Sequence, residues 1–342
     1  MAFVFTGCET IATVDLNESS AELTTAADNA EQTSDNTVSD KTLQSTEPTT
    51  AFEEVVTREY NPTDVDVKSY NYSFSLTDFG KVISMPDFNS FLEELQTIVN
   101  DSKFKLAFCY KNIEIGAEIK FNENTDFLTC STIKPAFVKS LLESGVDPEA
   151  KVLRTTKWPG DYNYVASLPY GTELTVKELM QRAVSYSDNS AYYLLHQRFG
   201  ASAFNENQQK LNSSIRLPSN WIFTYCTAYE ALNNYVDIYN YIENGEHGEF
   251  LKKLMTADDV DVNMQVRKAL EAKYTVAEKY GSEFASGRDE NQFHSCDIVF
   301  AESPYVLTIF TNQYPETEES AEVFRKIAVV INKINTVLYI QK

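Results

Sequence analysis

The order of its predicted secondary-structure elements is the feature that most constrains the fold of this chain. An apolar stripe over 87–99 predicts an amphipathic helix, and apolar runs at 104–110 and 113–120 predict two strands after it. The middle, from 131 to about 270, is mostly helical in pattern, and three strands and an amphipathic helix over 319–338 follow it. Strands at both ends predict an α+β fold (an α/β sandwich): an antiparallel sheet with flanking helices and an inserted all-helical subdomain. A cleft between the two parts is a natural place for a ligand.

Short apolar segments place the three strands that follow the helical middle. The first ends at 276–279, and the other two, 296–300 and 305–310, flank a Ser303-Pro304 turn. This is a strand–turn–strand pattern. We therefore expect one folded domain over 66–342.

Composition separates this domain from what precedes it. The chain has 342 residues, 43% of them hydrophobic, which is enough to bury a sizeable core. Its net charge is −21 and no basic stripe is present, so binding to nucleic acid is excluded. From Cys8 to Tyr60 there are 12 acidic and 2 basic residues among many Ser, Thr, Ala, Asn and Gln. We expect residues 9–65 to form a disordered, self-repelling acidic tether.

The N-terminus suggests what the tether is attached to. Residues 1–8 end in Phe3-Val4-Phe5-Thr6-Gly7-Cys8, which looks like the end of a bacterial lipoprotein signal with Gly7-Cys8 as its processing site. The basic region and most of the apolar stretch are missing, so on this interpretation the start is truncated or misassigned. The alternative is an ordinary apolar N-terminus with a chance cysteine. A lipid on Cys8 would hold the domain off a membrane surface.

The other cysteines and the histidines predict no further chemistry. The remaining cysteines lie in apolar or strand-like segments without C-x-x-C spacing, and we expect buried free thiols, although a disulfide stays open: Cys109, Cys130, Cys226 and Cys296. The three histidines lack metal-ligand spacing, so no metal site and no cofactor are predicted: His196, His247 and His294. No run of 18 apolar residues follows Cys8, so no transmembrane helix is expected.

Three short motifs carry the chemistry. Ser131-Thr132-Ile133-Lys134 places a lysine one helical turn from a serine, where its amine can take the hydroxyl proton and make a nucleophile. Ser187-Asp188-Asn189 and Lys279-Tyr280-Gly281 add a second hydroxyl, an amide and a second cation. A chance S-x-x-K also occurs at Ser102–Lys105, but it lies between a helix and a strand. Ser131 instead opens a segment that can be helical from Thr132 onward, where free N–H groups favour a developing anion.

Together the three motifs resemble the active site of class A β-lactamases and penicillin-binding proteins, whose signature is S-x-x-K, S-D-N and K-T-G. The spacing is 56 residues from Ser131 to Ser187 and 92 from Ser187 to Lys279, which fits the family's layout. The resemblance covers the chain from about Pro86 to its C-terminus. It implies a β-lactamase/transpeptidase-like fold and a cell-surface serine acyl-hydrolase.

The resemblance also implies the roles of the residues that make the acyl-enzyme. Ser131 would be the nucleophile and Lys134 the nearest base, with its pKa lowered by burial near Lys279. Ser187 would relay the proton to the leaving nitrogen. Asn189 would hold Lys134 and the substrate amide, while Asp188 would orient its own turn.

Further residues would bind the substrate. Lys279 would attract its carboxylate, and the backbone N–H groups of Ser131 and Ser282 would form the oxyanion hole. Gly281 would leave room for the substrate backbone. Tyr280 replaces the family's Thr or Ser, and its hydroxyl could face the substrate carboxylate or its ring could crowd the cleft.

A second departure concerns deacylation. The family's β-lactamases carry a Glu after the second motif, with an Asn four residues on, which activates the hydrolytic water. Residues 199–225 contain one carboxylate, Glu206, without that spacing. Glu230 and Asn234 have the spacing, but they lie at the start of a predicted helix, where we expect Glu230 to be a surface residue. We therefore expect slow deacylation.

Two functions follow from these observations. The leading one is an acyl-hydrolase at the extracellular face of a bacterial membrane, lipid-anchored through Cys8 and monomeric. It forms an acyl-enzyme on Ser131 with a small-molecule β-lactam or a D-alanyl peptide of peptidoglycan. The alternative is a catalytically inactive, lipid-anchored binding or scaffold protein that retains the fold. Tyr280 and the missing loop Glu favour the alternative. The presence of all five polar residues that the family's chemistry needs counts against it: Ser131, Lys134, Ser187, Asn189 and Lys279.

Overall fold

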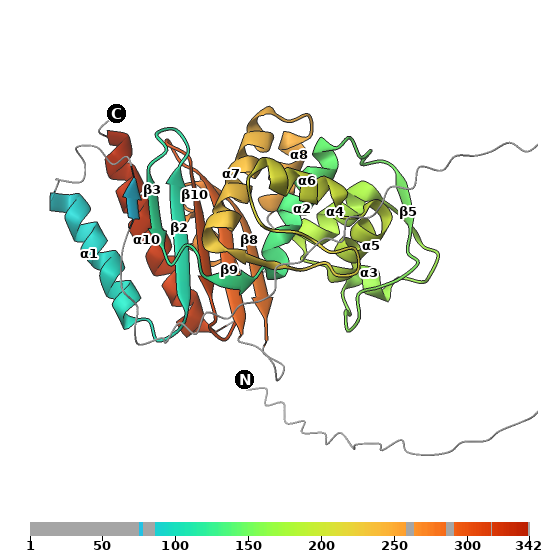
Figure 1. Cartoon of the computed structure of the whole chain (residues 1–342), viewed down its shortest axis with the longest axis horizontal. Helices are drawn as coiled ribbons and strands as arrows, with labels where there is room; N and C mark the ends of the chain where they lie inside the picture. The colour runs from blue at the N-terminus through green and yellow to red at the C-terminus, as the bar shows by residue number, and fades with distance from the viewer. Residues whose placement is uncertain (1–74, 78–85, 258–262, 285–290, 316, 341–342) are drawn as a thin grey trace, which may run out of the picture. The chain divides into compact units, whose positions relative to one another are not determined.

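The computed structural model describes residues 75–77, 86–257, 263–284, 291–315 and 317–340. The expected signal remnant at 1–8 and the tether over 9–65 lie outside these residues, so both stay predictions. Within the described residues the chain forms an antiparallel sheet, helices that cover its two faces, and a helical part beside it (Figure 1). The predicted α+β architecture is therefore confirmed.

The sheet has six strands in the order β1-β3-β2-β10-β9-β8, and every neighbouring pair is antiparallel. Its strands come from both ends of the described chain: β1 (Ser75–Thr77), β2 (Leu106–Asn112), β3 (Glu118–Phe121), β8 (Thr275–Glu283), β9 (Gln292–Phe300) and β10 (Tyr305–Thr311). The edge strand β8 carries the third motif. Its register pairs Lys279 with Cys296 of β9.

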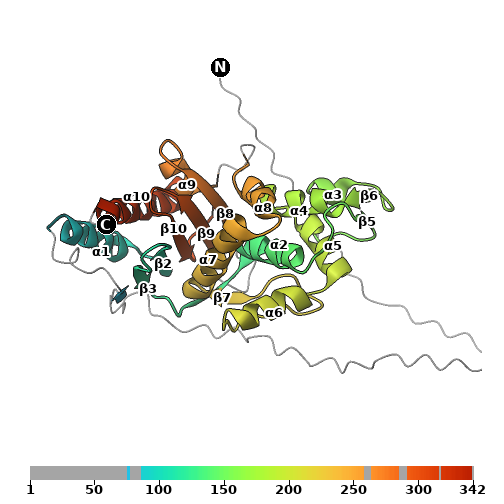
Figure 2. The same cartoon turned by 90° about the horizontal axis from the view of Figure 1, so that it is seen from above.

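The two faces of the sheet bury different cores, because successive side chains of a strand point to opposite faces. One face packs under α1 (Pro86–Asp101), α9 (Gln265–Leu270) and α10 (Glu318–Ile340), as Figure 2 shows from above. The other face, which includes Ala277 and Cys296, joins the core of the helical part. Lys279 is two residues from Ala277 along β8, so it faces the helical part.

In the described residues, the helical part contains eight helical segments and two short strand pairs. The helical segments are η2 (Cys130–Ile133), α2 (Lys134–Glu143), α3 (Tyr164–Ser167), α4 (Val176–Ser185), α5 (Asn189–Phe199), α6 (Ser202–Lys210), α7 (Ala228–Asn244) and α8 (Gly248–Met255). The strand pairs are β4 (Asp126–Leu128) with β7 (Tyr225–Thr227) and β5 (Lys151–Leu153) with β6 (Glu173–Thr175). Thr175 caps α4 in a capping box with Glu178, as its sequence predicts.

Some predicted strands are wrong in their bounds: β8 continues beyond the expected end at 279 to Glu283, and β9 begins at Gln292 rather than at 296. The strand expected at 113–120 is confined to β3, because Asn112 and Gly116 form a turn before it. The Asn112 side-chain oxygen accepts the N–H groups of Glu114 and Ile115, and Gly116 has φ of +74°, a conformation that glycine adopts without strain. The apolar Ile113 and Ile115 imitate a strand pattern inside this turn.

Candidate active site

Ser131 lies in a short turn that connects β4 to α2. It belongs to the 3₁₀ segment η2, and α2 begins at Lys134 with Pro135 in its first turn. The helix that was expected from Thr132 therefore starts as a tighter turn two residues earlier, at Cys130. Cys130, which precedes Ser131, has φ of +44°, a region that residues other than glycine rarely adopt. Such strained residues persist where the surrounding structure over-determines them, and they cluster at functional sites.

Lys134 is completely buried beneath this turn, and its amine is held by the second motif. Its Nζ donates to the Ser187 carbonyl oxygen at 2.7 Å and to the Asn189 Oδ1 at 2.6 Å. Burial, followed by the charge of Lys279, lowers the pKa of Lys134 well below its usual value. A neutral amine has two N–H groups and one lone pair. Because both N–H groups are already used, the lone pair is left for a proton from elsewhere.

Ser187 lies between the two lysines. Its φ of +55° gives the chain a sharp turn there, and its carbonyl faces Lys134 while its hydroxyl accepts from the Lys279 Nζ at 3.0 Å. The Lys134 Nζ is 3.5 Å from the same hydroxyl oxygen. Asp188 accepts the N–H groups of Ala191 and Val165, so it caps α5 and orients the turn. The Ser187 hydroxyl proton stays free for a third partner.

Gly281 lets β8 approach the nucleophile turn closely. A Cβ at this position would lie 3.0 Å from both the Ser131 backbone nitrogen and the Cys130 Cβ. The absent side chain therefore makes room for the Ser131 turn itself, a reason that differs from the room for substrate expected from sequence. The Gly281 backbone therefore lies close to the backbone nitrogen of Ser131. Ser282, the next residue on β8, is partly exposed.

Tyr280 presents its ring to Lys279. The side chain is only 9% exposed, and the Lys279 Nζ lies 4.3 Å from the ring centroid, within cation–π range. The same Nζ donates to the Tyr280 carbonyl at 2.9 Å. Tyr280 thus helps to hold the second lysine in place.

The structure brings Lys134, Ser187, Asn189 and Lys279 into one hydrogen-bonded network, with Ser131 at its edge. Within the part of the chain that is described, the Ser131 hydroxyl makes no hydrogen bond, so its expected direct contact with Lys134 and Ser187 is not made. Catalytic contacts are often long without substrate and tighten when it binds. Both lysines are buried, whereas Ser131, Ser187 and Asn189 are partly exposed, so solvent and ligands reach the hydroxyls and the amide.

The two candidate loop carboxylates lie on α6 and in the first turn of α7. Glu206 is exposed on α6. Glu230 forms a capping box with Thr227 at the start of α7, and it also accepts the N–H of Ser214. Asn234 exchanges two hydrogen bonds with Gln208. Glu230 was expected to be a surface residue, whereas the structure shows it partly buried and engaged in the cap of α7.

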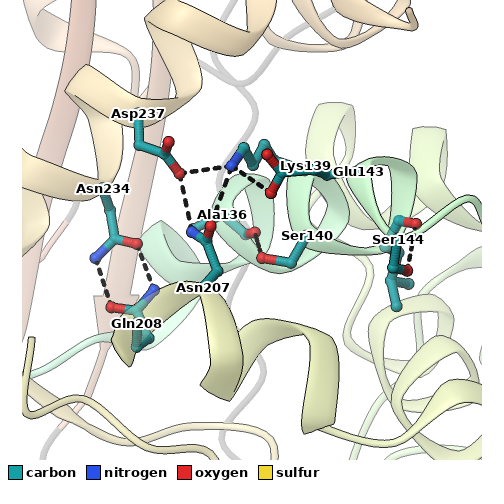
Figure 3. A network of polar contacts seen from close by, with 10 residues as sticks. Ala136, Lys139, Ser140, Glu143, Ser144, Asn207, Gln208, Asn234 and Asp237 are labelled. Atoms are coloured by element: carbon teal, nitrogen blue, oxygen red, sulfur yellow. Dashed lines mark hydrogen bonds and ion pairs between the residues drawn. The ribbon is translucent and has the colours of Figure 1, made fainter. Parts of the chain in front are cut away.

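A buried lysine that the sequence did not single out anchors the helix of the first motif (Figure 3). Lys139 on α2 is 1% exposed and contacts Asp237 of α7 at 2.7 Å and Glu143 at 2.8 Å. Asn207 of α6 bridges Lys139 and Asp237. The only sequence signal was the i,i+4 spacing of Lys139 and Glu143, which is typical of an ordinary surface pair.

The remaining cysteines and acidic groups supply no further site. Cys109, Cys130, Cys226 and Cys296 are buried free thiols. In the described ranges, no group of three or more His, Cys, Asp or Glu side chains is arranged to hold a metal ion. Among the helices described, none has both the length and the hydropathy needed to cross a membrane.

The chain is similar to a known family along most of its length. A model described as the β-lactamase enzyme family matches residues 90–334. A comparison with curated protein sequences found no match.

Solved structures with the same fold are distant in sequence. The extended-spectrum β-lactamase TLA-1 is 15% identical with a TM-score of 0.59, over 72% of this chain and 99% of that one. A β-lactamase from Chitinophaga pinensis is 17% identical with a TM-score of 0.59, over 71% and 98%. A mutant of PBP-A, in an acyl-enzyme complex with penicillin G, is 16% identical with a TM-score of 0.58, over 71% and 94%. At these identities the likeness establishes the fold.

Proposed function

Because the chain belongs to the β-lactamase enzyme family, we propose that it is a serine acyl-hydrolase that forms an acyl-enzyme on Ser131. The observation that carries this proposal is the state of Lys134. Its amine is buried, its pKa is lowered, and both N–H groups of its neutral form are held by Ser187 and Asn189. An uncharged amine in this arrangement can act as a base toward the hydroxyl of the neighbouring Ser131. The substrate is a β-lactam or a D-alanyl peptide.

Acylation follows from this arrangement. The Lys134 lone pair accepts the Ser131 proton while the Ser131 oxygen attacks the substrate carbonyl. The carbonyl oxygen becomes negative and accepts from the N–H groups of Ser131 and Ser282. When the carbonyl–nitrogen bond breaks, Ser187 gives its proton to the leaving nitrogen and recovers one from the Lys134 ammonium, 3.5 Å away. Protons and electrons balance, because the Ser131 proton passes through Lys134 to Ser187 while the Ser187 proton ends on the leaving nitrogen.

Substrate binding uses the same network. Lys279 is a cation beside Ser187 and would attract the carboxylate that β-lactams and D-alanyl peptides both carry. The Asn189 Oδ1 is bound to Lys134, which turns the amide NH₂ to a substrate carbonyl. Tyr280 supports Lys279 through its ring and carbonyl, and this is its proposed contribution to binding.

Deacylation is proposed to be slow. Releasing the acyl group requires a base that activates water, and Glu206 and Glu230 are both placed elsewhere. PBP-A is a protein whose acyl-enzyme with penicillin G could be crystallised, in a mutant form. A long-lived acyl-enzyme in this chain would resemble a penicillin-binding protein more than an efficient β-lactamase.

Intact-mass spectrometry after incubation with benzylpenicillin tests the proposal, with Ser131→Ala as the matched control. We expect the wild type to gain the mass of one penicillin and to keep it for minutes, while Ser131→Ala gains none. Rapid Ser131-dependent loss of the penicillin would contradict slow deacylation. If penicillin stays intact and D-alanine is not released from a D-alanyl-D-alanine peptide either, the inactive binding protein becomes the better account.

We further propose that the enzyme is lipid-anchored through Cys8 at the extracellular face of a bacterial membrane. The proposal is supported by Gly7-Cys8 and the acidic composition of 9–65. Fractionation of cells that express the chain behind a complete lipoprotein signal peptide, with Cys8 intact or changed by Cys8→Ala, tests it. Wild-type protein should sediment with membranes and the variant should not; equal distribution would count against the anchor.

A further inference from the structure

The strand that carries the third motif, β8, ends in a carboxylate, Glu283. The strand pairs with β9 in continuous register as far as Glu283 and Gln292, so its side chains alternate between the two faces of the sheet without a break. Lys279, Gly281 and Glu283 therefore share the face that is turned toward the helical part. Glu283 lies two residues beyond Gly281, a separation of about 7 Å along the strand.

This position puts Glu283 beside the nucleophile turn. At Gly281 the strand is so close to the turn that a Cβ there would lie 3.0 Å from the Cys130 Cβ. Burial, followed by the charge of Glu283, raises the pKa of the Cys130 thiol, so the carboxylate acts electrostatically on the residue that precedes Ser131. The Glu283 carboxylate and the Ser131 hydroxyl thus belong to two segments that are packed against each other.

The Glu283 carboxylate is available for chemistry. Among the described residues it has no hydrogen-bond or ion-pair partner, and the residue is exposed to water. Part of the side chain is covered, and this burial raises the pKa of Glu283 above its usual value, which makes the carboxylate a better proton acceptor. The two carboxylates near the second motif are occupied instead, since Asp188 and Asp161 each accept two backbone N–H groups.

We propose that Glu283 is the general base that releases the acyl group from Ser131. This inference rests on the proposed function and names the residue behind its slow deacylation. A water molecule between Glu283 and the ester carbonyl loses a proton to the carboxylate while its oxygen attacks the carbonyl carbon. The bond from that carbon to the Ser131 oxygen then breaks, and this oxygen takes the proton back from Glu283. One water is consumed, and the products are the free acid and the free serine.

The same features predict that this base is a weak catalyst. Because its carboxylate has no hydrogen-bond partner among the residues that the structure describes, nothing there orients it toward the water. A positioned general base typically accelerates a reaction by about 100- to 10,000-fold. A base that is not oriented contributes less, and we expect roughly 10- to 100-fold from Glu283. This agrees with an acyl-enzyme that is released slowly.

The test follows the decay of the acyl-enzyme. Wild type, Glu283→Gln and Glu206→Gln are acylated with benzylpenicillin, freed of excess penicillin and sampled over time by intact-mass spectrometry. We expect Glu283→Gln to be acylated at the wild-type rate and to lose the adduct at least about tenfold more slowly. Glu206→Gln removes an exposed carboxylate of α6 and should behave as wild type.

The pH dependence of this decay distinguishes a base from a structural residue. In wild type the decay rate should rise with pH through the pKa of Glu283, which lies above its usual value of 4.5, and then level off. Glu283→Gln should lack this rise. Formate, added as a small carboxylate, should accelerate the decay in Glu283→Ala but not in wild type.

The outcomes separate this inference from the proposed function. If the wild type forms no adduct, the proposed function fails and the inference fails with it, because no acyl group is present to release. If the adduct forms on Ser131 but decays equally fast in wild type and Glu283→Gln, or decays in neither, only the inference is overturned. A loss of acylation and of decay by the same factor in Glu283→Gln would also overturn it, since the carboxylate would then have a structural role.

Discussion

At the scale of single residues, Lys134 and Lys279 have different roles because their surroundings differ. Lys134 is completely buried, and its amine binds two uncharged oxygens. Lys279 instead lies against the Tyr280 ring and the Ser187 hydroxyl, contacts that suit a cation. Because two positive charges in one site repel each other, the cation at Lys279 helps to keep Lys134 neutral. The sequence predicted both residues, but not which oxygens hold them.

The lowered pKa of Lys134 predicts how acylation depends on pH. Lys134 acts as a base only when neutral, so the acylation rate constant should rise with pH and level off at a pH well below the usual lysine pKa. Stopped-flow acylation with benzylpenicillin between pH 5 and pH 10 would measure it. A rate that keeps rising to the alkaline end would contradict a neutral Lys134. Lys134→Arg, which stays charged, should reduce acylation at least about a hundredfold at every pH.

Gly281 offers a second test at this scale. A methyl group at this position would press on the Ser131 backbone nitrogen and on Cys130, so Gly281→Ala should displace the nucleophile turn. Small displacements of reacting groups are costly, and we expect acylation to fall by about 10- to 100-fold. The melting temperature should change little, since Gly281 lies near the end of the edge strand β8. If Gly281→Ala were acylated at the wild-type rate, the Ser131 turn would tolerate the added methyl group and the prediction would be wrong.

At the scale of elements, β8 contributes to the active site on one face and to the attachment of α9 on the other. Lys279 faces the helical part, while its neighbour Glu278 is buried on the opposite face and accepts the N–H of Arg267 in the first turn of α9. Ser295 on β9 donates to Glu278 and lies within hydrogen-bond distance of Asp297. Burial raises the pKa of Glu278 to about 7, and it also raises that of Asp297.

This buried pair of carboxyl groups predicts a loss of stability as pH rises. The folded state keeps a proton that the unfolded chain releases above its usual pKa of about 4.5. The free energy of unfolding should therefore decrease between about pH 4.5 and pH 7, by a total on the order of 3 kcal/mol. Urea denaturation across this range measures it. Glu278→Gln should flatten the profile, whereas Glu93→Gln, at an exposed position on α1, should leave it unchanged.

Apolar periodicity in the sequence identified most of the helices and strands. It failed where a local hydrogen bond determined the conformation of the backbone. The first and last helices and the strands β2 and β10 lie close to where apolar spacing predicted them, whereas β8 extends four residues beyond its predicted end at 279 and β9 begins four residues before 296. The second strand was predicted too long, because the Asn112 side chain closes a turn that its apolar neighbours hide. Lys139, in the helical part, is a second feature that apolar periodicity did not predict. Its buried contact with Asp237 joins α2 to α7 across 98 residues, and spacing within one helix carries no information about such a contact.

At the scale of the whole molecule, the fold follows from the order of the elements and the site follows from the fold. Strands from both ends of the described chain meet in one sheet, which brings Lys279 to the turns that carry Ser131 and Ser187. The three motifs predicted that these residues lie together in one site, but not the distances and hydrogen bonds between them. The contact between Trp158 and Trp221, whose ring centroids are 4.8 Å apart, was not predicted, since nothing in the sequence relates the two residues before the chain folds. The predicted acidic tether and lipid anchor lie outside the described residues.

The most direct test of the central claim is to locate the acyl group. Wild-type protein incubated with benzylpenicillin, quenched in acid and digested, would be sequenced by tandem mass spectrometry. The account predicts one modified residue, Ser131, on the peptide that also carries Lys134. A penicilloyl group on Ser187, on Ser102 or on a lysine, with Ser131 unmodified, would contradict the proposed nucleophile and with it the roles assigned to the network around it.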